Sequence, residues 1–208
     1  GILQAPVTSF TVSGATLTFA SNLATGDVID FVILLGNVLD IGVPSDGTVT
    51  SAKLSGVNEI TEADMWRLTA DADSPSGDIT SNWERVDSYG QGNLGTGMSE
   101  SSGIFTFPST GFWLITAIGN MKFTGGAHDH AQFNIYTTTD NSSYNRAVRA
   151  SDSSATTNYH ASTSGSILFD VTSTSTHKVK FYSSGDWTLQ GNTNENETHT
   201  WFLRVGDT

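Results

Sequence analysis

Two histidines one residue apart form the part of the sequence that could most directly hold a metal ion. Alternate side chains of a β-strand point to one face, so His128 and His130 could bind the same ion. Imidazole suits iron, nickel or zinc, and three such pairs around a three-fold axis would supply an octahedral set of ligands. Two glycines lie just before these histidines, and a solvated polar turn is the simpler interpretation. We therefore expect no metal and no cofactor, with His128 and His130 as the candidates if a metal is bound.

Paired carboxylates and nucleophilic side chains are the other possible chemical signals. Asp71 and Asp73 could supply the two acids of glycoside hydrolysis, but they lie in a Ser/Pro/Gly-rich segment where Asp commonly makes turn hydrogen bonds. The chain has no Cys, its serines lie in no Gly-x-Ser-x-Gly sequence, and the glycines of residues 90–97 precede neither a helix nor a Lys. The oxygen-rich residues 186–196 lack a recognisable calcium-loop spacing. The sequence therefore predicts a protein that is not an enzyme and has no catalytic residues.

Aromatic rings beside amides and hydroxyls favour a binding function instead. Tyr144, Tyr159 and Trp187 lie in or next to long polar segments, one of which also contains Asn192 and Asn194. A ring covers apolar area on a ligand while amides adapt their hydrogen bonds, a combination that suits the recognition of sugar or protein. Each ring could instead close one end of a β-sandwich. We expect these five residues to contribute to a binding site.

The composition excludes several classes of partner. The 208 residues carry a formal net charge of −12, and phosphate backbones and anionic lipids repel such a chain. Nucleic acid is therefore not an expected partner, and the absence of a long apolar run argues against membrane insertion. Abundant Gly, Ser, Thr and Asn indicate a β-rich protein with many tight turns. Because residue 1 is Gly and no leader sequence is present, we expect a fragment or processed product of something longer.

The chain divides into three expected parts. Residues 1–42 form a small β module with strands at 10–12, 16–19 and 27–35. Residues 43–58 break the strand pattern and form a neck or linker, in which residues 48–54 could make one or two helical turns. Residues 59–208 show β patterns throughout, which is typical of a sandwich or jelly roll. Strands are expected in this part at residues 65–69, 83–86, 98–107, 112–121, 131–136, 146–150, 167–171, 178–182, 187–190 and 200–205, with hairpins across 108–111 and 172–176. Residues 131–136 alternate, with Ala131, Phe133 and Ile135 expected inward and Gln132, Asn134 and Tyr136 outward.

Three of these strands are apolar on both faces: residues 112–118, 167–171 and 201–205. A strand with no wet face is usually covered by helices, and the sequence predicts none of useful length. A neighbouring subunit is the remaining cover, although loops folded over a thick single core are an alternative. The residues expected in the core or a trimer interface are Phe112, Trp113, Leu114, Ile115, Phe169, Trp201 and Leu203. The sequence does not say which face points to the axis, so a charge at Leu114 or Ile115 should disrupt either the fold or the trimer.

The sequence GIFTFPSTGFWLITA resembles the central signature of the C1q/TNF-like jelly rolls. That signature has a Phe, a Gly six positions on, spaced aromatics and an upstream Asn or Asp. Phe105, Gly111 and Asn93 match it, whereas Trp113 stands where the family has Tyr and Ile115 where it has Phe. The closing sequence TWFLRVGDT resembles the last strand of the same fold. The resemblance implies an all-β, ten-strand jelly-roll sandwich that assembles as a tight trimer.

Longer segments resemble the C1q-like head domains of bacteriophage tail-fibre and related virion proteins. They are ITEADMWRLTAD, SNWERVDSYGQGNLGTGMSESSGIFTFPSTG, ILFDVTSTSTHKVKF and FLRVGDT, and the sequences FTVSGATLTFASNLATGDVIDFVILL and GVPSDGTVTSAKL are similar to the β module and neck of such fibres. The resemblance implies a homotrimer in the virion, in a tail fibre or other external appendage. Its N-terminal module would contact other virion proteins, and its jelly roll would attach to a host surface glycan or protein. The alternative is a structural virion protein, for capsid decoration or fibre assembly, with no receptor-binding role.

Overall fold

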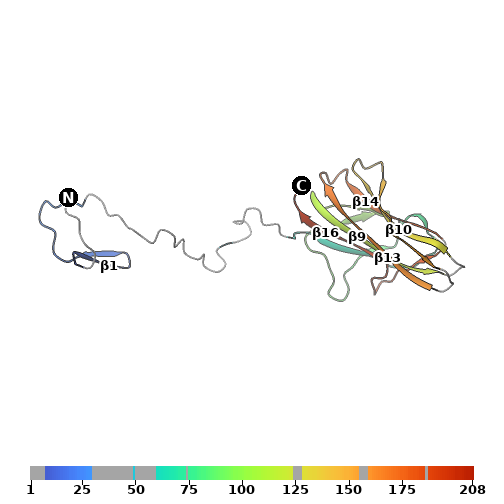
Figure 1. Cartoon of the computed structure of the whole chain (residues 1–208), viewed down its shortest axis with the longest axis horizontal. Helices are drawn as coiled ribbons and strands as arrows, with labels where there is room; N and C mark the ends of the chain where they lie inside the picture. Colours follow the sequence, from blue (N-terminus) through green and yellow to red (C-terminus); the bar gives the residue numbers. More distant parts are fainter. Residues whose placement is uncertain are drawn as a thin grey trace. The chain divides into compact units, whose positions relative to one another are not determined.

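The computed structural model describes residues 8–29, 49, 60–73, 75–123, 128–154, 159–185 and 187–208. The chain divides into two compact units, residues 1–53 and 54–208 (Figure 1). All regular structure in the described residues is β, which confirms the expected all-β class. None of these residues belongs to a helix that could span a membrane. The expected neck, residues 43–58, lies outside the described residues except for residue 49, so its boundaries stay predictions.

The described residues of the first unit form a β-hairpin. Strands β1 (Phe10–Ser13) and β2 (Thr16–Phe19) pair antiparallel around Gly14, whose φ of 59° suits the tight turn. This confirms the first two strands expected in the small β module. The third expected strand, residues 27–35, is not formed at residues 27–29, and the rest of it lies outside the described residues.

One sheet of the second unit, here called the β9 sheet, is built around the strand β9 (Gly111–Phe123). On one side β9 pairs with β13 (Tyr159–Val171), and on the other with β16 (His199–Gly206). Next to β16 lies β3 (Ala63–Leu68), which also pairs with β6 (Trp83–Arg85). The short strands β15 (Thr188–Leu189) and β4 (Ala72–Asp73) complete the sheet. Figure 1 shows β13, β9 and β16 side by side.

The second sheet, here called the β10 sheet, has β10 (His128–Thr138) and β14 (Lys178–Ser184) at its centre. Strands β11 (Asn145–Val148) and β12 (Ser151–Ser154) pair with β10. Strands β8 (Ile104–Thr106) and β5 (Ser76–Asp78) pair with β14, and β7 (Ser99–Ser101) pairs with β8. Within the described residues each sheet has seven strands, several very short, where the sequence predicted ten in total.

Aromatic side chains fill the space between the two sheets. Phe105 is fully buried, and its ring centroid lies 5.3–5.4 Å from those of Trp66, Trp83, Phe181 and Phe202. These rings come from both sheets, and most of them meet Phe105 edge to face, an arrangement that adds to the free energy gained from burial. The position that matches the family signature at Phe105 therefore lies at the centre of the core.

Two connections expected to be hairpins join different sheets instead. β8 lies in the β10 sheet and β9 in the β9 sheet, so residues 107–110 cross the sandwich. Likewise β13 and β14 lie in different sheets, so residues 172–177 make a second crossing. At the first crossing the ring centroids of Phe107 and Trp113 lie 5.2 Å apart in the core. At the second, Phe169 of β13 and Phe181 of β14 belong to the same core cluster. The prediction of two hairpins was therefore wrong. Turn residues signal a reversal of the chain, but they do not specify whether the two strands pair in one sheet or pack face to face in different sheets.

Two further segments differ from expectation. Residues 98–107 are not one strand, because a turn at Ser102 and Gly103 with positive φ at both residues divides them into the β7–β8 hairpin. The polar residues 151–164, where no strand was expected, contain β12 and the first half of β13. This half of β13 alternates small residues inward with serines outward, and a pattern without large side chains gives a weak strand signal.

Candidate functional site

The seven residues expected in the core or an interface divide between the two faces of the β9 sheet. The buried, inward-facing ones are Trp113, Ile115 and Phe169. The outward-facing ones are Phe112, Leu114, Trp201 and Leu203. The structure therefore settles which side chains belong to the core, and the rest form part of an outer apolar surface.

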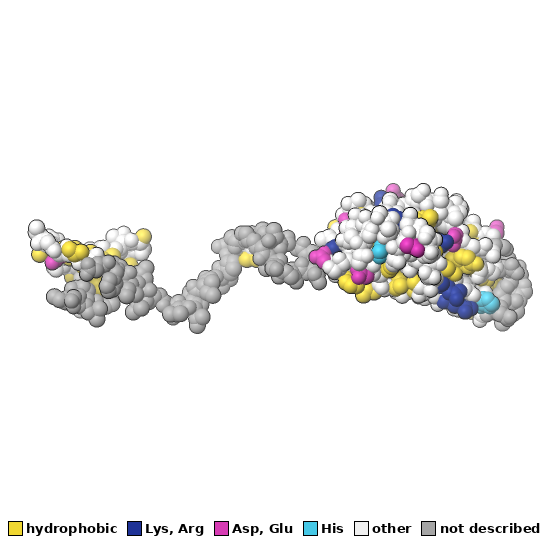
Figure 2. Space-filling view, turned by 90° about the horizontal axis from the view of Figure 1, so that it is seen from above, with side chains coloured by type: hydrophobic (Ala, Val, Ile, Leu, Met, Phe, Trp, Pro, Cys, Tyr) yellow, Lys and Arg dark blue, Asp and Glu magenta, His cyan; other side chains and the backbone are white. Residues whose placement is uncertain are grey.

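This outer apolar surface, called the apolar face below, runs across three strands. Leu114 pairs in register with Leu168 on one side and with Leu203 on the other. The side chains of Leu168, Trp201 and Leu114 are 57 %, 44 % and 37 % exposed. Val205 and Phe112 join Leu168 around a shallow depression at the end of the sheet. In the space-filling view, hydrophobic side chains reach the surface along the flank of this domain (Figure 2). Because exposed apolar patches are typical of interaction sites, the apolar face is the candidate functional site of this domain.

The same outer sheet surface becomes polar further along the strands. Thr116 and Ser166 share a hydrogen bond between their hydroxyl oxygens, 2.8 Å apart. Beyond them, His160 pairs in register with Lys122, and the Nδ1 of His160 lies 2.8 Å from the Oε1 of Gln190. The most exposed side chains of the apolar face thus lie toward the end of the sheet where β9 begins and where β13 and β16 end.

The five residues expected to bind a receptor do not form one site. Trp187 is 1 % exposed, its ring packs near that of Phe123, and it therefore belongs to the core rather than to a surface platform. Tyr159 is exposed at the start of β13. Asn192 and Asn194 lie in the loop before β16, where the Asn194 N–H donates to the Asn192 side chain. Tyr144 lies beside Lys180 of the β10 sheet.

The expected metal candidates are not on the apolar face. His128 and His130 lie on β10, which belongs to the other sheet, and the pairing register shifts between His128 and Ala131. No group of three or more His, Asp or Glu side chains in the described part of the chain is placed to hold a metal ion. Asp71 accepts a hydrogen bond from the Gly191 N–H, and Asp73 accepts one from the Thr188 hydroxyl. Both carboxylates therefore have structural partners.

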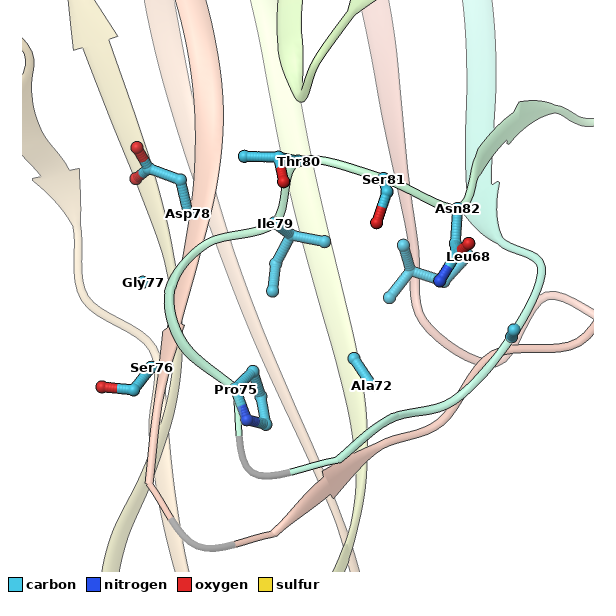
Figure 3. A pocket seen from close by; sticks show the side chains of 11 residues that line it. Leu68, Ala72, Pro75, Ser76, Gly77, Asp78, Ile79, Thr80, Ser81 and Asn82 are labelled. Atoms are coloured by element: carbon cyan, nitrogen blue, oxygen red, sulfur yellow. The ribbon is translucent and has the colours of Figure 1, made fainter.

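A small pocket lies between the end of β3 and residues 75–82, but its lining has little chemistry to offer (Figure 3). Aliphatic side chains, among them Leu68, Ala72 and Ile79, form much of the wall together with hydroxyls and Asn82. Asp78 is the one titratable residue of the lining, and its side chain points away from the centre of the pocket (Figure 3). It forms an ion pair with Lys180 instead.

Sequence reasoning missed a cluster on the outer side of the β10 sheet. The Nζ of Lys180 lies 4.3 Å from the ring centroid of Tyr144 and 2.7 Å from a carboxylate oxygen of Asp78. Burial and the carboxylates of Asp78 and Asp140 raise the pKa of Tyr144. The sequence had indicated Tyr144 as a binding residue, and the outward position of Tyr136 in the alternating residues 131–136 was a second signal. The other members were missed because the partners on β14 and β5 come from distant segments.

No protein-family model and no curated protein sequence matches this chain. Among solved structures, it is similar to Eiger TNF from S. frugiperda, with 9 % identity and a TM-score of 0.56 over 72 % of this chain and 96 % of that chain. It is also similar to murine APRIL at pH 5.0, with 11 % identity and a TM-score of 0.49 over 69 % and 98 % of the two chains. The likeness to Eiger confirms a TNF-like jelly-roll fold, and at this identity it bears on the fold alone.

The turn at Asp140 should make stability depend on pH. Hydrogen bonds from the Ser143 and Ser142 N–H groups and from the Thr138 hydroxyl lower the pKa of Asp140 from its ordinary value of 3.8. The carboxylate therefore stabilises the folded state above this value, and the stabilisation is lost as the pH falls below it. We expect Asp140→Asn to lower the free energy of unfolding at pH 7 and to lower it less at pH 2.5, as measured by urea denaturation.

The control is Asp87→Asn, at an exposed position, which should leave the free energy of unfolding unchanged at both pH values. An equal loss for Asp140→Asn at pH 7 and pH 2.5 would contradict the assigned role of the carboxylate.

Proposed function

We propose that this chain is a homotrimeric fibre or appendage protein of a virion, and that its jelly roll attaches to a receptor on the host surface. The observation that carries the proposal is the apolar face, where Leu114, Leu168 and Trp201 are left open to water in a single chain. The virion setting rests on the resemblance of the long sequence segments to phage fibre heads.

Burial of the apolar face between copies would remove its free-energy cost. Each Å² of apolar surface withdrawn from water contributes about 25 cal/mol, and stable interfaces of this type resemble a core cut in half. A single sheet face can meet its own copies around a closed rotation axis, which satisfies every copy at once. The C1q/TNF-like resemblance implies three copies. Since each chain carries a charge of −12, apolar burial must also outweigh repulsion between the copies.

Trimer formation also suits attachment to a surface. Three receptor sites held in one particle bind together, so modest affinity at each site becomes strong attachment. The acidic chain disfavours adhesion by charge to an anionic envelope and favours short-range polar and stacking contacts. The N-terminal module, in this proposal, joins the head to the other virion proteins.

Two neighbouring residues of β9 separate the fold from the assembly. Leu114 faces outward on the apolar face, whereas Ile115 is fully buried in the core. We expect Leu114→Asp to give a folded monomer by light scattering and circular dichroism, because the new charge can stay in water in a single chain. Ile115→Asp should lose at least about 4 kcal/mol of stability, because it buries an unpaired charge.

Leu114→Met, which keeps an apolar side chain of similar volume, is the control and should stay trimeric. A Leu114→Asp protein that remains trimeric would show that the apolar face is not the subunit interface.

The attachment role is tested with the purified full chain on host cells. We expect fluorescently labelled protein to bind the cells and to compete with infection, and the monomeric Leu114→Asp protein to bind far more weakly because avidity is lost. A trimer that neither binds cells nor competes would contradict the receptor role and favour the structural virion protein.

A further inference from the structure

The outer surface of the β10 sheet presents an ordered group of tyrosines. In β10 and β14, Phe133, Ile135, Val179 and Phe181 are fully buried in the core. The residues that alternate with them lie on the outer side of the sheet, where Tyr136, Lys180 and Tyr182 are partly exposed and Gln132 and Asn134 are buried. Tyr136 pairs in register with Lys180, and Tyr182 pairs with Asp78 of β5. Residues paired across neighbouring strands form rows on the outer side of the sheet. Two neighbouring rows thus each place a tyrosine beside a charged residue.

The tyrosines of these rows contact each other and an ion pair. The rings of Tyr136 and Tyr182 have centroids 5.4 Å apart at an interplanar angle of 40°. Lys180 lies over the ring of Tyr144 and forms its ion pair with Asp78. Three of the chain's five tyrosines therefore meet on one surface, called the tyrosine face below. Its two central strands are fixed by pairing on both sides, so the rings are held in place before any ligand arrives.

Polar and apolar side chains extend the tyrosine face at both ends of one row. Arg146 of β11 is exposed and pairs in register with Tyr136. On the far side of Lys180, the partly exposed Ile104 of β8 continues the row. Tyr136 and Tyr182 are half-buried, so the surface offers partly exposed rings in its middle, with hydrogen-bond donors and a carboxylate within the same two rows.

We propose that the tyrosine face is a binding site for a neutral saccharide, an assignment that rests on the proposed attachment function and names its ligand class. The C–H faces of a pyranose ring match the faces of Tyr136 and Tyr182, and its hydroxyls match Asp78, Lys180 and Arg146. Because Lys180 already neutralises Asp78, no ionic group on the ligand is needed. The net charge of −12 repels polyanions, which favours a neutral saccharide over an acidic one.

The position of the site is compatible with assembly. The tyrosine face is on the outer surface of the β10 sheet, whereas the apolar face is on the outer surface of the β9 sheet, with the core between them. Subunits that join through their apolar faces would leave all three tyrosine faces open to a saccharide on a cell surface.

The test uses the full-length trimer on immobilised oligosaccharides: maltohexaose, cellohexaose, mannohexaose and N-acetylchitohexaose as neutral probes, and oligogalacturonate as the acidic probe. We expect binding to at least one neutral probe and none to oligogalacturonate. Tyr136→Ala and Tyr182→Ala should each weaken that binding about tenfold, whereas Tyr136→Phe should retain it, because the ring and not the hydroxyl makes the contact.

Tyr89→Ala is the matched control, since Tyr89 is 80 % exposed and lies outside the tyrosine face. No binding to any neutral probe, binding to oligogalacturonate alone, or full binding by folded Tyr136→Ala protein would each overturn the assignment. If Tyr136→Ala and Tyr182→Ala trimers still compete with infection as the unmodified protein does, the assignment of the binding site to the tyrosine face is wrong, while the attachment function stands. If the unmodified protein does not compete with infection, the attachment function itself is contradicted.

Discussion

Strand β9 has neighbours on both edges and apolar side chains on both faces, and the rest of the domain depends on this combination. Its edges pair with β13 along its whole length and with β16 along much of it. One face supplies Trp113 and Ile115 to the core, which fixes the sandwich. The other face presents Leu114 to water together with Leu168 from β13. Among the described residues, the core covers the first face, whereas the second face is left partly open to water.

The two sheets of the sandwich place self-association and ligand binding on opposite surfaces of the domain. The apolar face on the β9 sheet suits self-association, and the tyrosine face on the β10 sheet suits contact with a ligand. The aromatic core around Phe105 lies between them, so a change on one surface need not disturb the other. This arrangement explains how one small domain could serve both assembly and attachment.

The sequence predicted local features well and long-range pairing poorly. Alternation placed Ala131, Phe133 and Ile135 in the core, and the three doubly apolar runs all fall on neighbouring strands of one sheet. The two crossings were mistaken for hairpins, because turn residues do not determine which sheet each arm joins. Trp187 was mistaken for a surface ring, since the same side chain also serves to fill a core. Of the tyrosine face, the sequence indicated Tyr144 as a binding residue but not its neighbours, because the rows join segments far apart in the chain.

The central claim is that the apolar face is covered by copies of the same chain. The most direct test is the mass of the unmodified protein in solution, measured by light scattering over a range of concentrations. Three chains of 22.1 kDa predict a single species of about 66 kDa. A single species of 22.1 kDa at all concentrations would contradict the account.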